Sequence, residues 1–309
     1  MMFLINKYAN NGRGLRRWET LKEEILEKAA VQEYSLIANA VNFNSELVSK
    51  ISDGERVFIA AGGDGTVNFL LNHLMELKKN SRQRVALGAI GLGSSNDFHK
   101  PLCKNRMLHG NIPYRMDYQN MIQHNVGQID FEDIHHKWHR KYFLLNCSIG
   151  IIAQANYLFN SKEKVVHWLK SKWVGGTIWY AALKTLFRAP NVHTIITTGK
   201  GRIETDVTNL SILINPYVSG DFHYDFNVTP QSDFFGIALC EKMGILSRVK
   251  TIFSLARGKF SGLNKTRMWR STHIELNPVT PTALELDGEV FLARKIKIQL
   301  LKNAMRVCQ

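Results

Sequence analysis

The chain has 309 residues, of which 45% are hydrophobic and 21% are charged. This composition is typical of a globular protein and excludes disordered, collagen-like and coiled-coil chains. The 40 Lys and Arg residues outnumber the 26 Asp and Glu residues, and the net charge of +14 indicates a polyanionic neighbour: nucleic acid, nucleotide phosphate or an anionic membrane.

The cysteines favour a reducing compartment. They are Cys103, Cys147, Cys240 and Cys308, which lie far apart in the chain and show no C-x-x-C spacing. This spacing argues against a disulfide framework and against a zinc ribbon. The first residues become polar too soon for a signal-peptide core, and no apolar run is long enough to span a bilayer. We therefore expect a cytoplasmic protein that meets a membrane only at its surface.

The first hundred residues alternate between strand and helix patterns. Apolar runs at residues 3–5, 34–37, 57–61 and 85–90 are typical of buried strands, and the last two are followed by glycine. Between these runs, apolar residues recur at helical spacing in residues 15–26, 47–51 and 67–77. The alternation predicts a parallel sheet covered by helices, in which ligands bind beyond the carboxyl ends of the strands.

The pattern changes after residue 125. Residues 126–134 and 142–149 are typical of strands around a polar hairpin, and helical stretches follow at 156–172 and 177–188. Short strands are then predicted at 194–198, 202–207, 210–214, 234–240, 273–276, 283–286 and 296–301. Many short strands separated by turns predict a mainly antiparallel second domain. We therefore expect a first domain of residues 1–125 and a second of residues 126–309.

The strongest functional signal follows the third predicted strand, at Gly62-Gly63-Asp64-Gly65-Thr66. Glycines let the backbone turn tightly and let phosphate oxygens approach its N–H groups. The helix that follows adds free N–H groups and the positive end of its dipole. Thr66 can cap this helix or donate to a phosphate, and Asp64 is placed to hold Mg²⁺. The alternative is a tight turn in which Asp64 only caps the helix.

This loop, with Asn68 after it, resembles the nucleotide loop of the diacylglycerol kinase catalytic superfamily, which includes bacterial lipid kinases and sphingosine and ceramide kinases. NAD kinases are more distant relatives. Residues 91–98 resemble the family's Pro-x-Gly-Thr-x-Asn-Asp-Phe, and residues 5–14 resemble its Asn-Pro-x-Ser-Gly-x-Gly opening. Gly91, Ser94 and Phe69 depart from the family pattern. The resemblance implies that ATP is bound by Asn6, Gly62, Gly63, Asp64, Gly65, Thr66, Val67, Asn68, Ser94 and Asn96.

The resemblance continues in the second domain. Residues 128–131 match a family strand whose aspartate, here Asp130, joins Asp64 and Asp97 in a water-linked Mg²⁺ network, and residues 146–150 match Asn-x-x-x-Gly. Asp287-Gly288-Glu289 resembles the turn that carries the catalytic base, without indicating which of the two acids is the base. The family also implies a structural Mg²⁺ held by the carbonyl groups of Pro230 and Phe235 and by the side chain of Asp233.

The resemblance as a whole implies an ATP- and Mg²⁺-dependent lipid kinase that phosphorylates a hydroxyl of diacylglycerol or a related membrane lipid. It implies an α/β N-terminal domain with a parallel sheet, as in NAD kinases and diacylglycerol kinases. It also implies a mainly antiparallel β-sandwich C-terminal domain, whose last strand packs back on the first domain.

Other functions and partners compete with this interpretation. An NAD kinase-like enzyme is one alternative, against which Asn68 and Asn96 argue; a catalytically silent nucleotide- or lipid-binding regulator is another. Nucleic-acid binding would explain the charge but none of the motifs. We expect peripheral binding to anionic membranes. Trp168, Trp173 and Trp179 among lysines fit either an interfacial helix or a helix packed in the core, and we leave a homodimer open.

Overall fold

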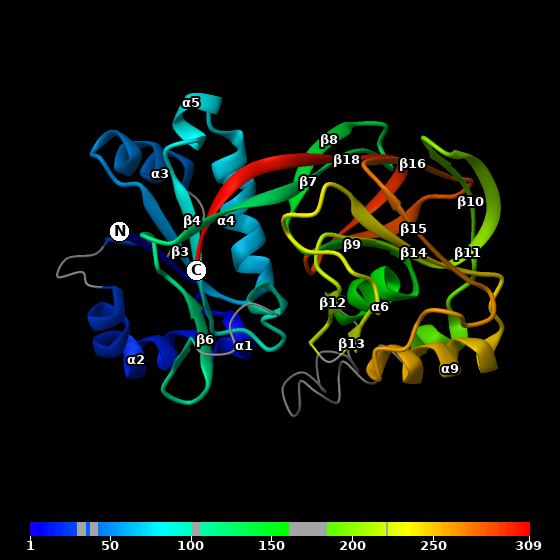
Figure 1. Ribbon diagram of the computed structural model, residues 1–309, viewed down its shortest axis with the longest axis horizontal. Helices are drawn as coiled ribbons and strands as arrows, with labels where there is room; N and C mark the ends of the chain where they lie inside the picture. Colours follow the sequence, from blue (N-terminus) through cyan, green and yellow to red (C-terminus); the bar gives the residue numbers. More distant parts are fainter. Residues whose placement is uncertain (30–34, 38–42, 101–105, 161–183, 221) are drawn as a thin grey trace. The chain divides into compact units, whose positions relative to one another are not determined.

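The computed structural model describes residues 1–29, 35–37, 43–100, 106–160, 184–220 and 222–309 (Figure 1). The chain divides into two compact units. Unit 1 consists of Met1–His124 with Asn303–Gln309, and unit 2 consists of Asn125–Lys302. The chain passes from unit 1 to unit 2 one residue before the boundary placed from the sequence, and its last residues belong to unit 1.

Unit 1 is built on a sheet whose strands pair in parallel in the order β2-β1-β3-β4. Arg306 and Val307 of β18 pair in parallel with β4, and β6 pairs with β4 in the antiparallel direction. The strands are β1 (Met2–Ile5), β2 (Ser35–Ile37), β3 (Val57–Gly62), β4 (Ala86–Gly91), β5 (Met107–Leu108) and β6 (Ile112–Arg115). The helical segments described in this unit are α1 (Ala9–Gly12), α2 (Gly14–Ala29), α3 (Phe43–Ser52), α4 (Asp64–Glu76), α5 (Lys79–Arg82) and the 3-10 turn Asp97–His99.

Both faces of the sheet in unit 1 are covered. Successive side chains of a strand point to opposite faces, so two buried neighbours in one strand show that both faces are buried. Phe3 and Ile59 lie in one hydrophobic cluster with Trp18 of α2. Phe58, the neighbour of Ile59 in β3, is buried as well, and α4 contacts β3 and β4 (Figure 1). The continuous apolar sequences of β3 and β4 are therefore required by burial on both sides.

Unit 2 consists mainly of antiparallel strands. They are β7 (Met121–Asp133, which begins in unit 1), β8 (Trp138–Phe143), β9 (Asn146–Gly150), β10 (Val192–Thr198), β11 (Gly201–Leu213), β12 (Tyr217–Val218), β13 (Phe222–His223), β14 (Phe235–Glu241), β15 (Thr266–Ser271), β16 (His273–Pro278), β17 (Thr282–Leu286) and β18 (Glu289–Cys308, which ends in unit 1). The described helices are α6 (Ile151–Asn160), residues 184–188 and α9 (Ile245–Ala256).

The strands of unit 2 are hydrogen-bonded along a closed path. β11 pairs with β10, β10 with β16, β16 with β18, β18 with β17, β17 with β9, and β9 again with β11. A β-sandwich was expected here, and the strands are instead joined in one sheet. The length of β11 explains this, because its first half pairs with β10 and its second half with β9. Leu210, Ile237 and Leu284 are among the fully buried residues that these strands share.

Two helices of unit 2 differ from the prediction. α6 begins at Ile151, directly after Gly150, whose φ of +95° ends the strand, whereas the sequence pattern places a helix from residue 156. The pattern predicts no helix at α9. Its buried residues, Arg248, Thr251 and Leu255, recur at helical spacing, but two of them are polar and interrupt the apolar stripe.

Candidate active site

The first glycine loop joins β3 to α4. Gly63 is the last residue before the helix, and Asp64 is its first residue, so the positive end of the α4 dipole lies at this loop. Thr66 is buried, and its hydroxyl accepts a hydrogen bond from Asn6 Nδ2 at 3.0 Å. A Cβ atom at Gly62 would overlap with the Thr66 side chain. The structure thus brings together Asn6, Gly62 and Thr66, three of the residues predicted to bind the nucleotide.

The second glycine loop, residues 91–98, touches the first. A Cβ atom at Gly93 would overlap with Gly63 Cα, and one at Gly63 would lie 3.2 Å from Gly93 Cα. The two backbones come this close because neither residue carries a side chain. Asn96, in the left-handed region with φ of +52°, fixes the loop by accepting from Gly93 N at 3.1 Å and donating to Gly91 O at 2.9 Å. Ser94 is exposed on this loop.

Asp64 connects the two loops. Its carboxylate accepts hydrogen bonds from the backbone N–H groups of Asp97 at 3.1 Å and of Phe98 at 3.0 Å. Asp97 is buried, and its carboxylate lies 3.2 Å from Lys100 Nζ. The sequence did not single out Lys100, although a lysine three residues after an aspartate in a short helical turn is a recognisable pair.

The donor set of these loops fits Mg²⁺. Proteins usually bind Mg²⁺ through one or two carboxylates together with substrate phosphates and water. Asp64 and Asp97 are the two carboxylates of these loops, and the backbone N–H of Asp97 donates to the carboxylate of Asp64. Over the ranges that the structure describes, no group of three or more His, Cys, Asp and Glu side chains is arranged to hold a metal ion. A metal at this loop would therefore depend on phosphate oxygens for the rest of its ligands.

Val67 and Asn68 lie on the buried side of α4, and Gly65 is exposed in its first turn. The side-chain oxygen of Asn68 accepts a hydrogen bond from Asn72 Nδ2 at 2.9 Å. Phe69, at the position where the family often has Glu, packs in an aromatic cluster with Phe43 of α3 and His73, at centroid distances of 5.1 and 4.4 Å. This departure from the family pattern therefore serves packing between α3 and α4.

In the Asp-Gly-Glu turn between β17 and β18, Asp287 is a structural anchor. It is 4% exposed and has a left-handed φ of +45°. Its carboxylate accepts three backbone hydrogen bonds, from Leu144 at 2.7 Å and from Leu145 and Asn146 at 3.0 Å each. These bonds hold the turn against the connection between β8 and β9.

Glu289, the second acid of the turn, is in a different environment. It is partly exposed, and burial raises its pKa above the ordinary value, while the cation of Lys141 lowers it. A raised pKa brings a carboxyl group closer to the range in which it exchanges protons near neutral pH. Glu289 is thus better suited than Asp287 to accept a proton from a ligand.

Glu285 is a third acid at this turn, and the sequence interpretation missed it. It is 3% exposed and accepts hydrogen bonds from Ser148 Oγ at 2.8 Å and from Gly288 N at 2.7 Å. Burial, with the charges of Glu285 and Asp287, raises the pKa of the neighbouring Cys147 thiol well above its usual range. A signal was present, because an acid stands among the apolar residues of β17 two positions before Asp287.

Asp130 pairs with a cation of its own unit. Arg140 on β8 lies opposite Asp130 on β7 and contacts its carboxylate with Nε at 2.6 Å and Nη2 at 3.1 Å. This bond raises the pKa of Arg140. Asp130 belongs to unit 2, whereas Asp64 and Asp97 belong to unit 1. A shared metal network of these three acids stays a prediction.

Two of the three donors expected for a structural Mg²⁺ already have partners in the protein. Pro230 O accepts from Asn125 N at 2.8 Å, and the carboxylate of Asp233 accepts from Lys302 Nζ at 2.7 Å. Phe235 is buried in β14, opposite Ser271 of β15. Lys302 Nζ competes with a divalent cation for the carboxylate of Asp233, as Lys100 Nζ does at Asp97, so the structural Mg²⁺ stays a prediction.

The tryptophan- and lysine-rich stretch that fits either an interfacial or a core helix, with Trp168, Trp173 and Trp179, lies outside the described residues. Among the helices that the structure does describe, none is both long and apolar enough to cross a bilayer.

Residues 1–131 match the family model of the diacylglycerol kinase catalytic domain. The chain is 20% identical over 311 residues to a Bacillus subtilis protein named "Putative lipid kinase YtlR", with 99% of this chain and 98% of that protein covered. It is 30% identical over 142 residues to a diacylglycerol kinase of Staphylococcus saprophyticus, with 46% of this chain and 42% of that enzyme covered.

Two solved structures show the same fold. A diacylglycerol kinase from Bacillus anthracis has a TM-score of 0.65 at 15% identity, with 99% of this chain and 95% of that chain covered. Yeast NADH kinase has a TM-score of 0.51 at 10% identity, with 99% of this chain and 81% of that chain covered. The solved structures show the fold alone. By sequence, residues 1–131 match the diacylglycerol kinase catalytic domain, and the chain is similar over nearly its whole length to a protein named a lipid kinase.

Proposed function

We propose that the protein is an ATP- and Mg²⁺-dependent kinase that transfers a phosphoryl group to a hydroxyl of diacylglycerol or a related lipid. The observation that carries the proposal is the contact between Gly63 and Gly93, clamped by Asp64 at the start of α4. Two glycine backbones and a helix N-terminus form a surface that admits phosphate oxygens and supplies N–H donors to them. The match of residues 1–131 to the diacylglycerol kinase catalytic domain supports the same chemistry.

On the nucleotide side, residues 62–67, Ser94, Asn6 and Asn96 would hold ATP. Asn6 and Asn96 would act indirectly, because the side chain of Asn6 donates to the Thr66 hydroxyl and the side chain of Asn96 accepts from the backbone N–H of Gly93. Asp64 and Asp97 would hold Mg²⁺, which neutralises charge on the transferred phosphoryl group when it is bound.

On the acceptor side, Glu289 would accept the proton of the lipid hydroxyl, and Asp287 would position the turn. The raised pKa of Glu289 and its partial exposure support the first role. The three backbone hydrogen bonds to Asp287 support the second. An NAD kinase-like activity and a catalytically silent regulator are the competing proposals.

A transfer assay separates these three proposals. The protein is incubated with ³²P-labelled ATP, with Mg²⁺ or EDTA, and with extracted lipids, purified diacylglycerol or NAD. We expect labelled lipid only with Mg²⁺, no labelled NAD, and loss of most turnover in Glu289→Gln. Glu275→Gln is the matched control, because Glu275 is a half-exposed acid of the same unit, paired with Lys297. Labelled NAD would favour the NAD kinase-like alternative, and no transfer at all would favour the silent regulator.

We further propose that the protein binds anionic membranes peripherally from the cytoplasmic side. The net charge of +14 supports this, because each well-placed Lys or Arg contributes about 1 kcal/mol at an anionic surface. Co-sedimentation with vesicles should rise with the fraction of anionic lipid and fall with added salt. Binding that ignores both variables would contradict the proposal.

A further inference from the structure

Helix α9, which runs along an edge of unit 2, exposes large apolar side chains and buries polar ones (Figure 1). The residues that it buries are Arg248, Thr251 and Leu255, two of which are polar. Leu246 is 87% exposed and Phe253 is 57% exposed, and at about 100° per residue both lie on the opposite side of the helix. A helix on the surface of a globular protein normally has the reverse arrangement, with its apolar residues facing inward. The exposed side of α9 is therefore suited to a further contact.

Basic residues lie on the same exposed side. Leu246, Lys250, Phe253 and Arg257 are four, three and four residues apart, which is the spacing of one helix face, and Arg257 directly follows the last helical residue. Both cations are exposed, and in the described parts of the chain no acid forms an ion pair with either of them. Their charge is thus available to a partner outside the chain.

The segment around α9 carries charge of one sign. Residues 242–274 contain eight Lys and Arg residues and no Asp or Glu. Arg248 is buried and the other seven are exposed, one of them paired with Glu241 just before the segment. Asp225, an acid from outside the segment, contacts it by accepting hydrogen bonds from two of its backbone N–H groups. The exposed side of α9 therefore combines apolar groups with a positive electrostatic potential.

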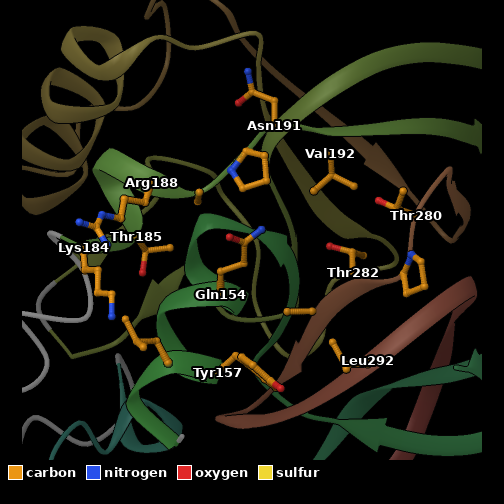
Figure 2. Close-up of a pocket in the computed structure, with 15 residues that line it drawn as sticks. Gln154, Tyr157, Lys184, Thr185, Arg188, Asn191, Val192, Thr280, Thr282 and Leu292 are labelled. Carbon is orange, nitrogen blue, oxygen red and sulfur yellow. The ribbon is translucent and has the colours of Figure 1, made fainter. Parts of the chain in front are cut away.

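A neighbouring segment adds the same two kinds of side chain. From α9, Arg248 donates to the carbonyl oxygens of Leu186 at 3.0 Å and of Ala189 at 2.8 Å, so their segment is fixed against the helix. Between them, Phe187 is 55% exposed and Arg188 is exposed as well. In Figure 2 this segment lines a pocket of unit 2, and the side chain of Arg188 extends from it. A further exposed aromatic ring and a further cation thus lie on a segment bonded to α9.

We propose that the exposed side of α9, with Leu246, Lys250, Phe253 and Arg257, is the surface by which the protein docks on an anionic membrane. An anionic bilayer attracts Lys and Arg to its headgroups and takes up Leu and Phe side chains beneath them. A second copy of the chain fits this surface less well, because a symmetric contact would bring the cations of α9 against the same cations of the other copy. The inference rests on the peripheral membrane binding proposed above and assigns that binding to one helix.

The test measures co-sedimentation of the full chain with vesicles of phosphatidylcholine, alone or with phosphatidylglycerol as one third of the lipid. The double variant Lys250→Gln/Arg257→Gln should bind the anionic vesicles about 25-fold more weakly at low salt, because each well-placed basic residue contributes about fivefold. Added salt should reduce this difference, since it screens the charges. The double variant Leu246→Gln/Phe253→Gln should bind about tenfold more weakly, and this loss should persist in salt, because burial of apolar groups is not screened.

Two control variants are matched to these changes. Lys137→Gln/Lys200→Gln removes the same charge from exposed residues of the same unit, and Val279→Gln removes an apolar side chain that is 69% exposed. All four substituted side chains at α9 are exposed, so both double variants should melt close to the parent. Equal losses in the α9 variants and in their controls would overturn the docking surface and leave peripheral binding as an effect of net charge. A parent protein that binds neither kind of vesicle would overturn both proposals.

Two further measurements separate this inference from the kinase proposal and from a protein partner. Transfer to diacylglycerol in anionic vesicles should fall in both α9 double variants, whereas transfer to dispersed dihexanoylglycerol should stay at the parent rate. Absence of all transfer would contradict the kinase proposal and leave the vesicle binding unchanged. Light scattering reports the oligomeric state. A parent dimer that dissociates in Leu246→Gln/Phe253→Gln, with vesicle binding unchanged, would assign this surface to a second copy of the chain and overturn the proposal.

Discussion

Replacing Asp287 by Asn tests whether this acid is an anchor. Asn tolerates the left-handed φ of +45°, so the substitution changes the hydrogen bonds and leaves the backbone conformation accessible. One amide oxygen can keep the bonds from Leu145 and Asn146, which both go to Oδ1. The amide nitrogen would then face the N–H of Leu144, which is buried, and two donors would oppose each other.

The expected loss in the free energy of unfolding is about 2–4 kcal/mol, from one charge-assisted bond removed and one buried N–H left unpaired. For a unit of this size each kcal/mol lowers the melting temperature by about 2–4 °C, so we expect a fall of about 5–15 °C. Calorimetry and urea unfolding measure the change. Glu289→Gln is the control, and it should melt close to the parent while losing most of its turnover. A melting temperature of Asp287→Asn within about 2 °C of the parent would refute the anchor role.

The pH dependence of turnover tests the role of Glu289. Its pKa is raised in the folded protein, so as a base it should lose activity on the acid side at a higher pH than an ordinary glutamate would. Lys141→Met removes the cation that lowers this pKa and should move the acid limb of kcat/KM further upward. The stability contributed by Glu289 changes with pH in the opposite direction to its activity as a base. The contribution of protonated Glu289 is present below its unfolded pKa and is lost as the pH rises through its folded pKa. An acid limb that is unchanged in both Lys141→Met and Glu289→Gln would assign the proton acceptor to another group.

Three further predictions concern the loops and the charges around them. Gly93→Ala should weaken ATP binding and lower stability, because the new Cβ atom would overlap with the backbone of Gly63. Gly65→Ala should keep or raise stability, because its Cβ atom would lie in open space. Equal stability losses of the two variants in thermal unfolding would contradict the steric argument. Burial lowers the pKa of His99 to about 3. The free energy of unfolding should therefore fall as the pH drops below the unfolded pKa of 6.5, by about 2 kcal/mol at pH 5. Urea titrations of His99→Gln should lack this part of the pH dependence. The nucleotide-free protein should melt at the same temperature in Mg²⁺ and in EDTA, because Lys302 Nζ contacts the carboxylate of Asp233. Lys302→Gln frees this carboxylate and should make the melting temperature sensitive to Mg²⁺. A parent protein whose melting temperature rises with Mg²⁺ would instead support a structural metal site at Asp233.

The glycine loops could be predicted from sequence because their signals are local. A buried strand, a run of glycines and the start of a helix are neighbours in the chain, and the structure places Gly63 and Asp64 where that order predicts. The clamp of Asp64 on the second loop could not be found in this way, because its partners lie 33 and 34 residues further along. The same holds for Asp287, whose three partners are separated from it by more than 140 residues. Nothing in Asp-Gly-Glu itself distinguishes an anchor from a base.

Strand β18 begins in unit 2 and ends in unit 1, and this affects when unit 1 can finish folding during synthesis. Residues 303–309 belong to unit 1, where Arg306 and Val307 pair with Ala86 and Leu87 of β4. A ribosome synthesises these residues only after the whole of unit 2. Until then, the β4 edge that they cover is open to pairing with other chains. A truncated chain that stops at residue 124 would keep that edge exposed permanently, so a gene fragment that ends there cannot produce unit 1 intact.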